Sequence, residues 1–347
     1  MAIPRSHAIV GCGRVAPNHV DGFRSLPDWT VAWACDRDQP TATAFAAEHG
    51  IPRWSAAWHE LLDDPALTSA SITVDHRQHA ELAIAFLEAG KHVLVEKPMA
   101  TQPADAQRMV DCAAANGRVL SVVAQHRYDP LVSAVRGWVR EGLLGDLLYV
   151  AVSLQSSRPE SYYADSYWRG TLDGEGGSAL INQGYHCLDT VRWICGDLAV
   201  RAAVTSTKVL ADVIETEETL SALLTADGVP VTMNVTVASS VDWRTRLEVV
   251  GALGSVTFDL DHPGTLHHWS GSAELYRRVS AEQARTAVAE PPGIDYYGIS
   301  HRRQIADFCQ SVTSGRPMLS TARDAIGTLD AVLGLYEHAA ASAAAVR

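Results

Sequence analysis

Glutamate, lysine and proline stand together at residues 96–98, directly after the apolar run HVLV (92–95). The run has the continuous β-rich character of a strand buried on both faces of a parallel sheet. Because Pro98 biases the residue before it towards extended backbone, the side chain of Lys97 leaves the strand end in a reproducible direction. A lysine held in this way can stabilise a developing negative charge, or act as a base where burial lowers its pKa.

A second candidate group lies in the segment GGSALINQGYHCLDTVRWICG (176–196), which we predict to be one helix with glycines at both ends. Asn182, His186 and Asp189 are spaced i, i+4 and i+7, so they would share one helix face. His186 is our first choice for a general acid or base, since an unperturbed imidazole titrates at about pH 6.5. Asn182 would position the imidazole or a substrate oxygen, and the glycine-rich start would let a ligand approach.

The segment GCGRVA (11–16) follows the apolar run HAIV (7–10) and opens a predicted helix. Gly11 and Gly13 are placed as in the G-x-G-x-x-A fingerprint, in which glycines allow a sharp turn and the helix N-terminus faces a pyrophosphate. Asp36 ends the next strand, where an acid binds ribose hydroxyls and repels a 2′-phosphate. We therefore expect NAD as the cofactor. NADP stays possible because Arg37 could accept the phosphate.

Strand and helix patterns alternate over the first 125 residues, which indicates βαβ units, a parallel sheet and a doubly wound Rossmann fold. The predicted strands cover 7–10, 29–36, 69–75, 92–95 and 119–125, and the helical segments cover 15–25, 39–50, 58–63, 79–90 and 103–117. Ligands of such sheets bind outside the carboxyl ends of the strands. The further cofactor contacts that we expect from these loops are Arg14, Val15, Val74, Asp75, His76, His79, Glu96, Lys97 and Gln125.

From residue 147 onwards, consecutive strand patterns indicate an α+β domain with a mixed, largely antiparallel sheet. The predicted strands cover 147–157, 200–210, 219–227, 229–240, 246–260 (with a turn at GALGS), 265–270 and 273–279, and ADGVP (226–230) signals a hairpin. Two helices are expected in 297–317 and 321–345. We predict a Rossmann domain at 1–125 and a substrate-binding and oligomerisation domain at 126–347, with the last helices packing back on the first domain.

Composition excludes some classes of partner. The 347 residues carry a formal net charge of −12, which argues against nucleic acid but allows a small anionic substrate. The six cysteines are scattered without zinc-site spacing, so we expect reduced thiols, a cytoplasmic protein and no metal. No apolar run approaches the roughly 18–20 residues of a membrane span, and no secretory signal is expected.

The G-x-G-x-x-A turn, EAGKHVLVEKP (88–98), GEGGSALINQGYHCLDTVRWICG (174–196) and the RRQIADF…GRP stretch (302–317) together resemble the Gfo/Idh/MocA oxidoreductases. These are the relatives of glucose–fructose oxidoreductase and inositol dehydrogenase. The resemblance implies an open-faced second sheet that pairs chains into homodimers or homotetramers, and it implies that Lys97 and His186 flank the nicotinamide. Many relatives carry an aspartate where Asn182 stands. An aspartate would raise the pKa of the histidine, whereas an amide can only hydrogen-bond it.

The resemblance implies a dehydrogenase or ketoreductase that moves a hydride between NAD(P) and a secondary alcohol or ketone of a sugar, NDP-sugar or cyclitol. LINQGYH (180–186) and YWRGT (167–171) look closest to branches that act on nucleotide-linked or amino sugars. Either His186 or Lys97 would take the hydroxyl proton. The expected substrate contacts are Arg127, Tyr163, Trp168, Arg169 and Asn182. Two alternatives are a dinucleotide-binding regulatory or sensor protein of the same fold, and a redox-neutral NAD-dependent glycosidase.

Overall fold

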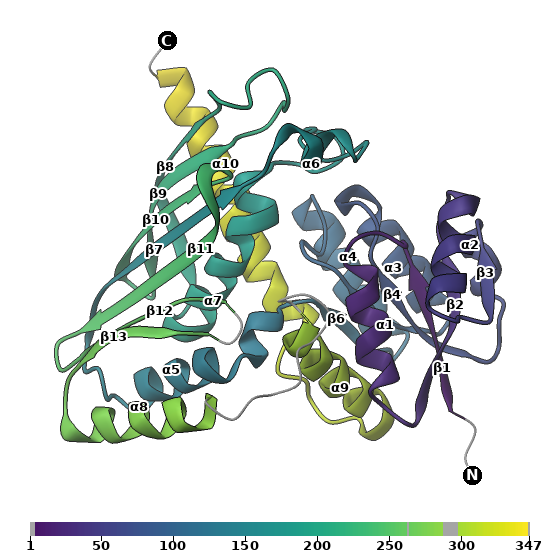
Figure 1. Cartoon of the computed structure of the whole chain (residues 1–347), viewed down its shortest axis with the longest axis horizontal. Coiled ribbons are helices and arrows are strands. Elements are labelled where there is room, and N and C mark those ends of the chain that lie inside the picture. The colour runs from purple at the N-terminus through teal and green to yellow at the C-terminus, as the bar shows by residue number, and fades with distance from the viewer. Residues whose placement is uncertain (1–3, 262–263, 287–297, 346–347) are drawn as a thin grey trace. The chain divides into compact units, whose positions relative to one another are not determined.

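The computed structural model describes residues 4–261, 264–286 and 298–345. It divides the chain into two compact units (Figure 1). Unit 1 comprises residues 1–125 and 291–326, and unit 2 comprises residues 126–290 and 327–347. A carboxyl-terminal segment thus belongs to the same unit as the first 125 residues. Among the described residues, no helix combines the length and hydrophobicity that a membrane span needs.

Unit 1 contains a six-stranded parallel sheet in the order β3-β2-β1-β4-β5-β6. Its strands are β1 (Arg5–Val10), β2 (Trp29–Cys35), β3 (Arg53–Ser55), β4 (Leu67–Ile72), β5 (His92–Val95) and β6 (Leu120–Val122). Its helices are α1 (Ala16–Arg24), α2 (Gln39–Glu48), η1 (Trp58–Leu61), η2 (His76–Gln78), α3 (His79–Glu88), α4 (Pro103–Ala115) and α9 (Gly298–Ser314). The strand order is that of a doubly wound dinucleotide-binding sheet, which confirms the predicted fold.

The apolar run of β5 is explained by its central place in this sheet. Val93, Leu94 and Val95 are all fully buried. On one face α1 packs against α9, and a Cβ on Gly22 of α1 would lie 2.3 Å from Cδ1 of Ile305 of α9. Glycine at position 22 therefore lets α9 approach closely enough to cover the sheet.

Unit 2 contains a seven-stranded sheet in the order β13-β12-β11-β7-β10-β9-β8. Its strands are β7 (Leu147–Ser157), β8 (Leu198–Ser206), β9 (Thr219–Ala226), β10 (Val229–Thr236), β11 (Ala238–Gly251), β12 (Ser255–Phe258) and β13 (Leu266–Ser270). Only the β7–β10 pair of this sheet is parallel, which confirms a mixed, largely antiparallel sheet. The β9–β10 hairpin turns at Asp227 and Gly228, whose φ angles are 44° and 88°, as the ADGVP signal predicted.

Helices cover one face of this second sheet (Figure 1). They include α5 (Pro130–Arg140), α6 (Glu160–Ala164), the π-helix η4 (Ala179–Gly184), α7 (Tyr185–Cys195), α8 (Ala273–Thr286) and α10 (Ala322–Ala345), and the short helix η3 (Gln125–Tyr128) precedes α5. Leu180 of η4, Leu188 of α7 and Val332 of α10 are fully or almost fully buried in one core with the sheet. The core therefore holds η4 and α7, which carry Asn182 and His186, against a rigid sheet.

Several sequence predictions for unit 2 were wrong in detail. Residues 273–279, predicted as a strand, begin helix α8. The helix predicted at 176–196 starts as a π-turn at Ala179 and becomes α-helical at Tyr185. The strand predicted at 229–240 is broken at 237, and the one predicted at 200–210 ends at Ser206. Helix α5 was not predicted at all, although the Asp129–Pro130 pair at its start is a helix-start signal.

Candidate active site

The turn after β1 has the two glycine positions expected of a dinucleotide-binding loop. Gly11 has a φ of +96°, and a Cβ there would lie 2.6 Å from the backbone of Thr73, so only glycine fits. A Cβ on Gly13, by contrast, would meet no atom within 4 Å, and Gly13 is exposed. The N-cap residue of α1, Val15, supplies no side-chain hydrogen bond to the first turn. An open glycine turn before a helix N-terminus without a side-chain cap fits a pyrophosphate.

The carboxylate of Asp36 is anchored to this turn. Its Oδ2 accepts a hydrogen bond from the backbone N of Cys12 at 2.9 Å, and its Oδ1 accepts one from the backbone N of Asp38 at 3.0 Å. The two bonds hold the carboxylate at the end of β2, where an acid discriminates against a 2′-phosphate. Arg37 is exposed beside it, and Arg14 is exposed in the glycine turn. Cofactor contacts from both arginines stay predictions.

The segment from the end of β4 to the first residue of α3 contains four residues that we predicted to contact the cofactor, namely Val74, Asp75, His76 and His79. Asp75 and His76 are buried, and Val74 is half-buried. Nδ1 of the fully buried His79 lies 2.7 Å from the carbonyl oxygen of Pro98, and its Nε2 lies 3.1 Å from that of Val74. Burial lowers the pKa of His79. This imidazole therefore ties the β4 loop to the proline turn after β5, and its direct contact with a cofactor stays a prediction.

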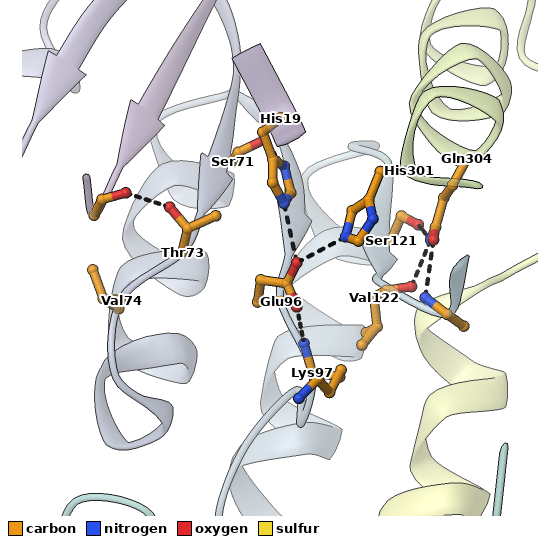
Figure 2. A network of polar contacts seen from close by, with 12 residues as sticks. His19, Ser71, Thr73, Val74, Glu96, Lys97, Ser121, Val122, His301 and Gln304 are labelled. Atoms are coloured by element: carbon orange, nitrogen blue, oxygen red, sulfur yellow. Dashed lines mark hydrogen bonds and ion pairs between the residues drawn. The ribbon is translucent and has the colours of Figure 1, made fainter. Parts of the chain in front are cut away.

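Glu96 is buried within a network of polar side chains from three elements (Figure 2). Its Oε1 accepts hydrogen bonds from Nε2 of His19 on α1 at 3.1 Å and from Nε2 of His301 on α9 at 3.4 Å. Its Oε2 accepts one from the backbone N of Lys97 at 3.2 Å. Burial alone would raise the pKa of Glu96, but the two histidines hold it well below its usual range. The ionised carboxylate thus fixes the start of the turn that carries Lys97.

The same three side chains are the best candidate metal ligands in the described part of the chain. The ligand atoms of His19, Glu96 and His301 all lie within 4.8 Å of one another. However, hydrogen bonds already join both imidazoles to the carboxylate, and Nδ1 of His19 lies 2.8 Å from Oγ of Ser71. These hydrogen bonds are sufficient to explain why the three side chains lie together. That the protein binds no metal stays a prediction.

Lys97 and Gln125 lie at the carboxyl edge of the first sheet, as predicted. Lys97 is half-buried, and its peptide bond to Pro98 is cis. Gln125 is 1% exposed, and its Oε1 has no hydrogen-bond partner among the described residues. A buried amide oxygen without a donor is costly. A donor from a bound ligand, such as the carboxamide of nicotinamide, would fit this position.

Sequence reasoning missed the polar residues of α9 that complete this edge. Gln304 accepts a hydrogen bond from the backbone N of Ala124 at 2.9 Å and donates one to the carbonyl oxygen of Val122 at 2.8 Å (Figure 2). It therefore satisfies backbone groups at the end of edge strand β6. The available signal was the pair His301 and Gln304, spaced i, i+3 within the helix predicted at 297–317.

In unit 2, a buried carboxylate organises the start of η4. Glu217 accepts hydrogen bonds from the backbone N of Ser178 at 3.2 Å, from that of Leu180 at 2.8 Å and from the hydroxyl of Tyr336 at 2.9 Å. A Cβ on Gly177 would lie 1.9 Å from the same hydroxyl. Tyr336 of α10 thus requires glycine at position 177. We had expected glycine there so that a ligand could approach, whereas the structure shows a packing reason.

Asn182 lies in the π-turn and is paired with an acid. Its Nδ2 donates a hydrogen bond to Oε1 of Glu175 at 2.6 Å, and lies 3.5 Å from the hydroxyl of Tyr162. Glu175 is fully buried, and its Oε2 accepts a hydrogen bond from the backbone N of Gly170 at 2.6 Å. The i→i+5 bonds of a π-turn add a residue to the turn, so the i, i+4 argument for a face shared with His186 does not apply.

His186 lies in the first turn of α7 and is 6% exposed. Its ring centroid is 5.1 Å from that of His126, with the two planes at 80°. Nδ1 of His126 lies 2.7 Å from Oδ2 of Asp129, so a carboxylate orients the neighbouring imidazole. His186 thus packs against an imidazole that is itself held by a carboxylate. Its acid–base role stays a prediction.

Arg127 and Asp189 form a buried ion pair. Nε of Arg127 donates to Oδ2 of Asp189 at 2.8 Å, Nη2 donates to Oδ1 at 2.6 Å, and Thr328 of α10 adds a third hydrogen bond at 2.9 Å. Burial would raise the pKa of Asp189, but Arg127 holds it below its usual range. The pair therefore joins η3, α7 and α10. This gives Arg127 a structural role that the sequence did not indicate, and its contact with substrate stays a prediction.

The remaining predicted substrate contacts cluster around α6. Tyr163 is buried with its hydroxyl 3.2 Å from Oγ of Ser178, and burial raises its pKa to about 12. Trp168 and Arg169 are half-buried, and the guanidinium carbon of Arg169 lies 5.4 Å from the indole ring centroid. These three residues therefore lie in the same part of unit 2 as Asn182, which hydrogen-bonds the neighbouring Tyr162.

A doubly wound sheet with a dinucleotide turn, joined to a mixed sheet that carries a histidine-bearing helix, is the architecture of a class of two-domain oxidoreductases. Residues 5–124 match the model of the oxidoreductase family with an NAD-binding Rossmann fold, and residues 132–257 match the GFO/IDH/MocA C-terminal domain. The chain therefore belongs to the Gfo/Idh/MocA family. The family match confirms the resemblance and the expected NAD-binding domain.

Individual relatives are more distant. The chain is 30% identical to trans-1,2-dihydrobenzene-1,2-diol dehydrogenase of Bos taurus over 190 residues, 54% of this chain and 55% of that protein. It thus spans about half the length of this relative. It is 27% identical to D-apiose dehydrogenase of Paraburkholderia graminis over 84% of this chain and 74% of that protein. The WlbA dehydrogenase from Bordetella pertussis, whose crystal structure was solved with NADH and UDP-GlcNAcA, has the same fold, with a TM-score of 0.87. The two chains are 24% identical, and the match covers 98% of this chain and 96% of that chain.

Proposed function

We propose that this protein is an NAD-dependent dehydrogenase that acts on a secondary hydroxyl, or on the corresponding ketone, of a sugar, NDP-sugar or cyclitol. The observation that carries the proposal is the presence of Lys97 and His186, which the resemblance implies flank the nicotinamide, in a chain that belongs to this family. A regulatory or sensor protein would need neither group for hydride transfer. The dehydrogenases of D-apiose and of dihydrobenzene diol among the relatives support a hydroxyl-bearing substrate.

Unit 1 would bind the dinucleotide and unit 2 the substrate. The pyrophosphate would bind at Gly11, Gly13 and the start of α1. Asp36 would accept hydrogen bonds from the adenosine ribose, and Gln125 would accept one from the nicotinamide end. The remaining proposed contacts are Arg14, Val15, Arg37, Val74, Asp75, His76, His79, Glu96 and Lys97. The bound NAD supplies the hydride acceptor. The open position at Gly13 and the unpartnered oxygen of Gln125 support this assignment.

The protein itself would supply proton transfer and charge stabilisation. His186 accepts the proton of the substrate hydroxyl as general base, and His126 beside it keeps the imidazole oriented. Lys97 donates a hydrogen bond to the same oxygen and stabilises its developing negative charge. Glu96 holds the backbone of Lys97. Arg127, Tyr163, Trp168, Arg169 and Asn182 are the proposed substrate contacts in unit 2.

A substrate screen tests this function. Purified protein with NAD would be offered glucose, glucuronate, myo-inositol, UDP-N-acetylglucosamine and UDP-N-acetylglucosaminuronate, and the absorbance of NADH would be followed. We expect net NADH formation with at least one of them. Substrate conversion without net NADH would indicate a redox-neutral glycosidase. NAD binding without conversion of any compound would favour a sensor.

We also propose that the uncovered face of the second sheet pairs two copies of the chain. Cross-strand neighbours place Tyr149, Leu223 and Val204 on this face, where they are 43%, 44% and 61% exposed. In the described part of unit 2, no helix covers it (Figure 1). Sedimentation should show a dimer or tetramer, and Leu223→Glu should shift it towards monomer, whereas Leu172→Glu, an exposed control, should not. A monomeric wild type would refute the proposal.

The cellular location stays a prediction. We expect the cytoplasm because all six cysteines are free thiols.

A further inference from the structure

Two arginines of unit 2 contact the ring of a single tyrosine. Arg158 directly follows β7, and Arg169 lies in the loop after α6. Their guanidinium carbons are 5.2 Å and 4.5 Å from the ring centroid of Tyr162. Arg158 also lies 5.8 Å from the ring of Trp243. The ring of Tyr162 is thus in contact with two like charges, an arrangement that costs free energy unless something compensates it.

Neither guanidinium has a carboxylate partner in the part of the chain that the structure describes. The other buried or partly buried arginines of unit 2 include Arg127 and Arg192, which pair with aspartates at 2.6 Å and 2.8 Å. Among the described residues, the hydrogen bond from Arg169 goes to the carbonyl oxygen of Tyr162, at 3.3 Å. The Nε atoms of Arg158 and Arg169 are both buried, and neither has a hydrogen-bond partner within residues 4–261, 264–286 and 298–345.

The remaining contacts of Arg158 are long and go to neutral oxygens. It donates to the carbonyl oxygen of Ser157 at 3.4 Å and to Oε1 of Gln183 at 3.5 Å. A guanidinium offers five N–H donors in a planar fork that matches carboxylate or phosphate oxygens. Cation–π contacts are worth only about 0.5–2 kcal/mol each. The two side chains therefore keep both charge and donors available for an anion.

We propose that Arg158 and Arg169 form a subsite for an anionic oxygen group of the substrate, either a carboxylate on the sugar or the diphosphate of an NDP-sugar. The inference rests on the proposed function. The position of the subsite supports it, since Gln183 follows Asn182 in η4 and Asn182 lies 3.5 Å from the hydroxyl of Tyr162. The anion would anchor the substrate on the same stretch of chain that carries His186.

Matched substrates and charge-neutral variants test the subsite. Arg158→Gln and Arg169→Gln would be compared with wild type and with Arg140→Gln, a control at an exposed position at the end of α5. The substrate pairs are UDP-N-acetylglucosamine with UDP-N-acetylglucosaminuronate, and glucose with glucuronate. We expect KM for the anionic substrates to rise about 10- to 100-fold in each arginine variant, the effect of losing a charge-assisted hydrogen bond. All values for the Arg140→Gln control should stay unchanged, and KM for glucose should change much less in the arginine variants than KM for the anionic substrates.

The pattern across substrates distinguishes the two sources of the anion. If the carboxylate binds here, only the uronic acids respond to the arginine variants. If the diphosphate binds here, both UDP-sugars respond equally and glucuronate does not. Equal KM values in wild type and both variants for every substrate would overturn the subsite. Arg158→Lys and Arg169→Lys, which keep the charge but lose the fork, should give intermediate KM values, and thermal unfolding would verify that all variants fold.

Calorimetry separates this proposal from the proposed function. UDP-N-acetylglucosaminuronate and glucuronate would be titrated into the protein with NAD present, without any need for turnover. Binding to wild type that weakens in the arginine variants supports the subsite even if no compound is oxidised. Oxidation of glucose or inositol, combined with no binding of either anionic compound, would overturn the subsite and leave the function standing.

Discussion

The side-chain amide of Asn182 donates a hydrogen bond of 2.6 Å to the fully buried carboxylate of Glu175. This pairing explains why a neutral donor suits position 182 in this chain. A carboxylate there would face a second buried carboxylate, and one of the two would have to take up a proton. The chemistry of position 182 is therefore set by Glu175 as well as by any effect on His186.

We expect Asn182→Asp to destabilise the protein. From the sequence alone, an aspartate would be expected to raise the pKa of His186 and shift the pH optimum. Because Glu175 is its partner, the new carboxylate should instead lower the free energy of unfolding by about 1–3 kcal/mol, the cost of an unsatisfied buried polar group. Urea unfolding at neutral pH measures it. The double variant Asn182→Asp with Glu175→Gln exchanges donor and acceptor and should recover part of the loss, whereas no recovery would contradict the pairing.

Removal of either proposed catalytic side chain should act on the chemical step. We expect Lys97→Ala and His186→Ala each to lower kcat by at least about 10²-fold, the low end for a general acid–base residue. The Kd for NAD, measured by calorimetry, should change much less. Lys208→Ala and His268→Ala remove exposed residues of the same types and serve as controls. Near-full activity of His186→Ala at all pH values would leave Lys97 as the only base.

Cofactor preference should depend on Asp36. Wild type should bind NAD more tightly than NADP, because the anchored carboxylate repels a 2′-phosphate. Asp36→Asn should narrow or reverse that preference by removing the charge, while Asp28→Asn, at an exposed position in the same unit, should not. Calorimetry with both dinucleotides provides the comparison. Tighter NADP binding by wild type would instead assign Arg37 as a phosphate ligand.

The buried pair of Arg127 and Asp189 should be important for stability. Asp189→Asn leaves the guanidinium buried without its counter-charge, which typically costs about 3–5 kcal/mol. Replacing both residues, as Arg127→Met with Asp189→Leu, should cost much less. Denaturant titrations of the three proteins test both statements, and a double variant as unstable as the single one would argue against the pair.

The stability difference between wild type and Asp189→Asn should depend on pH. The folded-state pKa of Asp189 lies below its unfolded value, so the stabilisation by the ionised group is complete above the unfolded pKa, about 3.9. It is lost as the pH falls through the lower folded-state pKa. Denaturant unfolding at several pH values should therefore show the difference shrinking only below about pH 4. A difference that shrinks between pH 8 and pH 6 would point to another group.

Local patterns in the sequence were sufficient for most of unit 1. Its central strand β5 is continuously apolar because both faces are buried, and glycines follow α2, α3 and α4, so the alternation of strands and helices could be recognised without tertiary information. The glycine turn at Gly11 and Gly13 was equally clear, since the conformation it needs is local. In unit 2, residues 273–279 show the limit of this approach. Leu275 and Val279 are fully buried at i, i+4 spacing in α8, which packs against α5, and a short run of this kind is ambiguous between strand and helix.

The partners of the site residues were decided only by the tertiary structure. Glu96 meets His301 from 205 positions away, and Tyr336 meets Ile181 from 155 positions away. Nothing in the local sequence around Glu96 or Gly177 indicates these contacts, because a hydrogen bond depends on where the fold brings two side chains and not on their spacing along the chain. The sequence alone determined the family, the fold class and the candidate residues Lys97 and His186. The tertiary structure decided which carboxylates are ionised, which arginine is structural and which two arginines are left for an anion, because burial and neighbouring charges exist only in the folded chain.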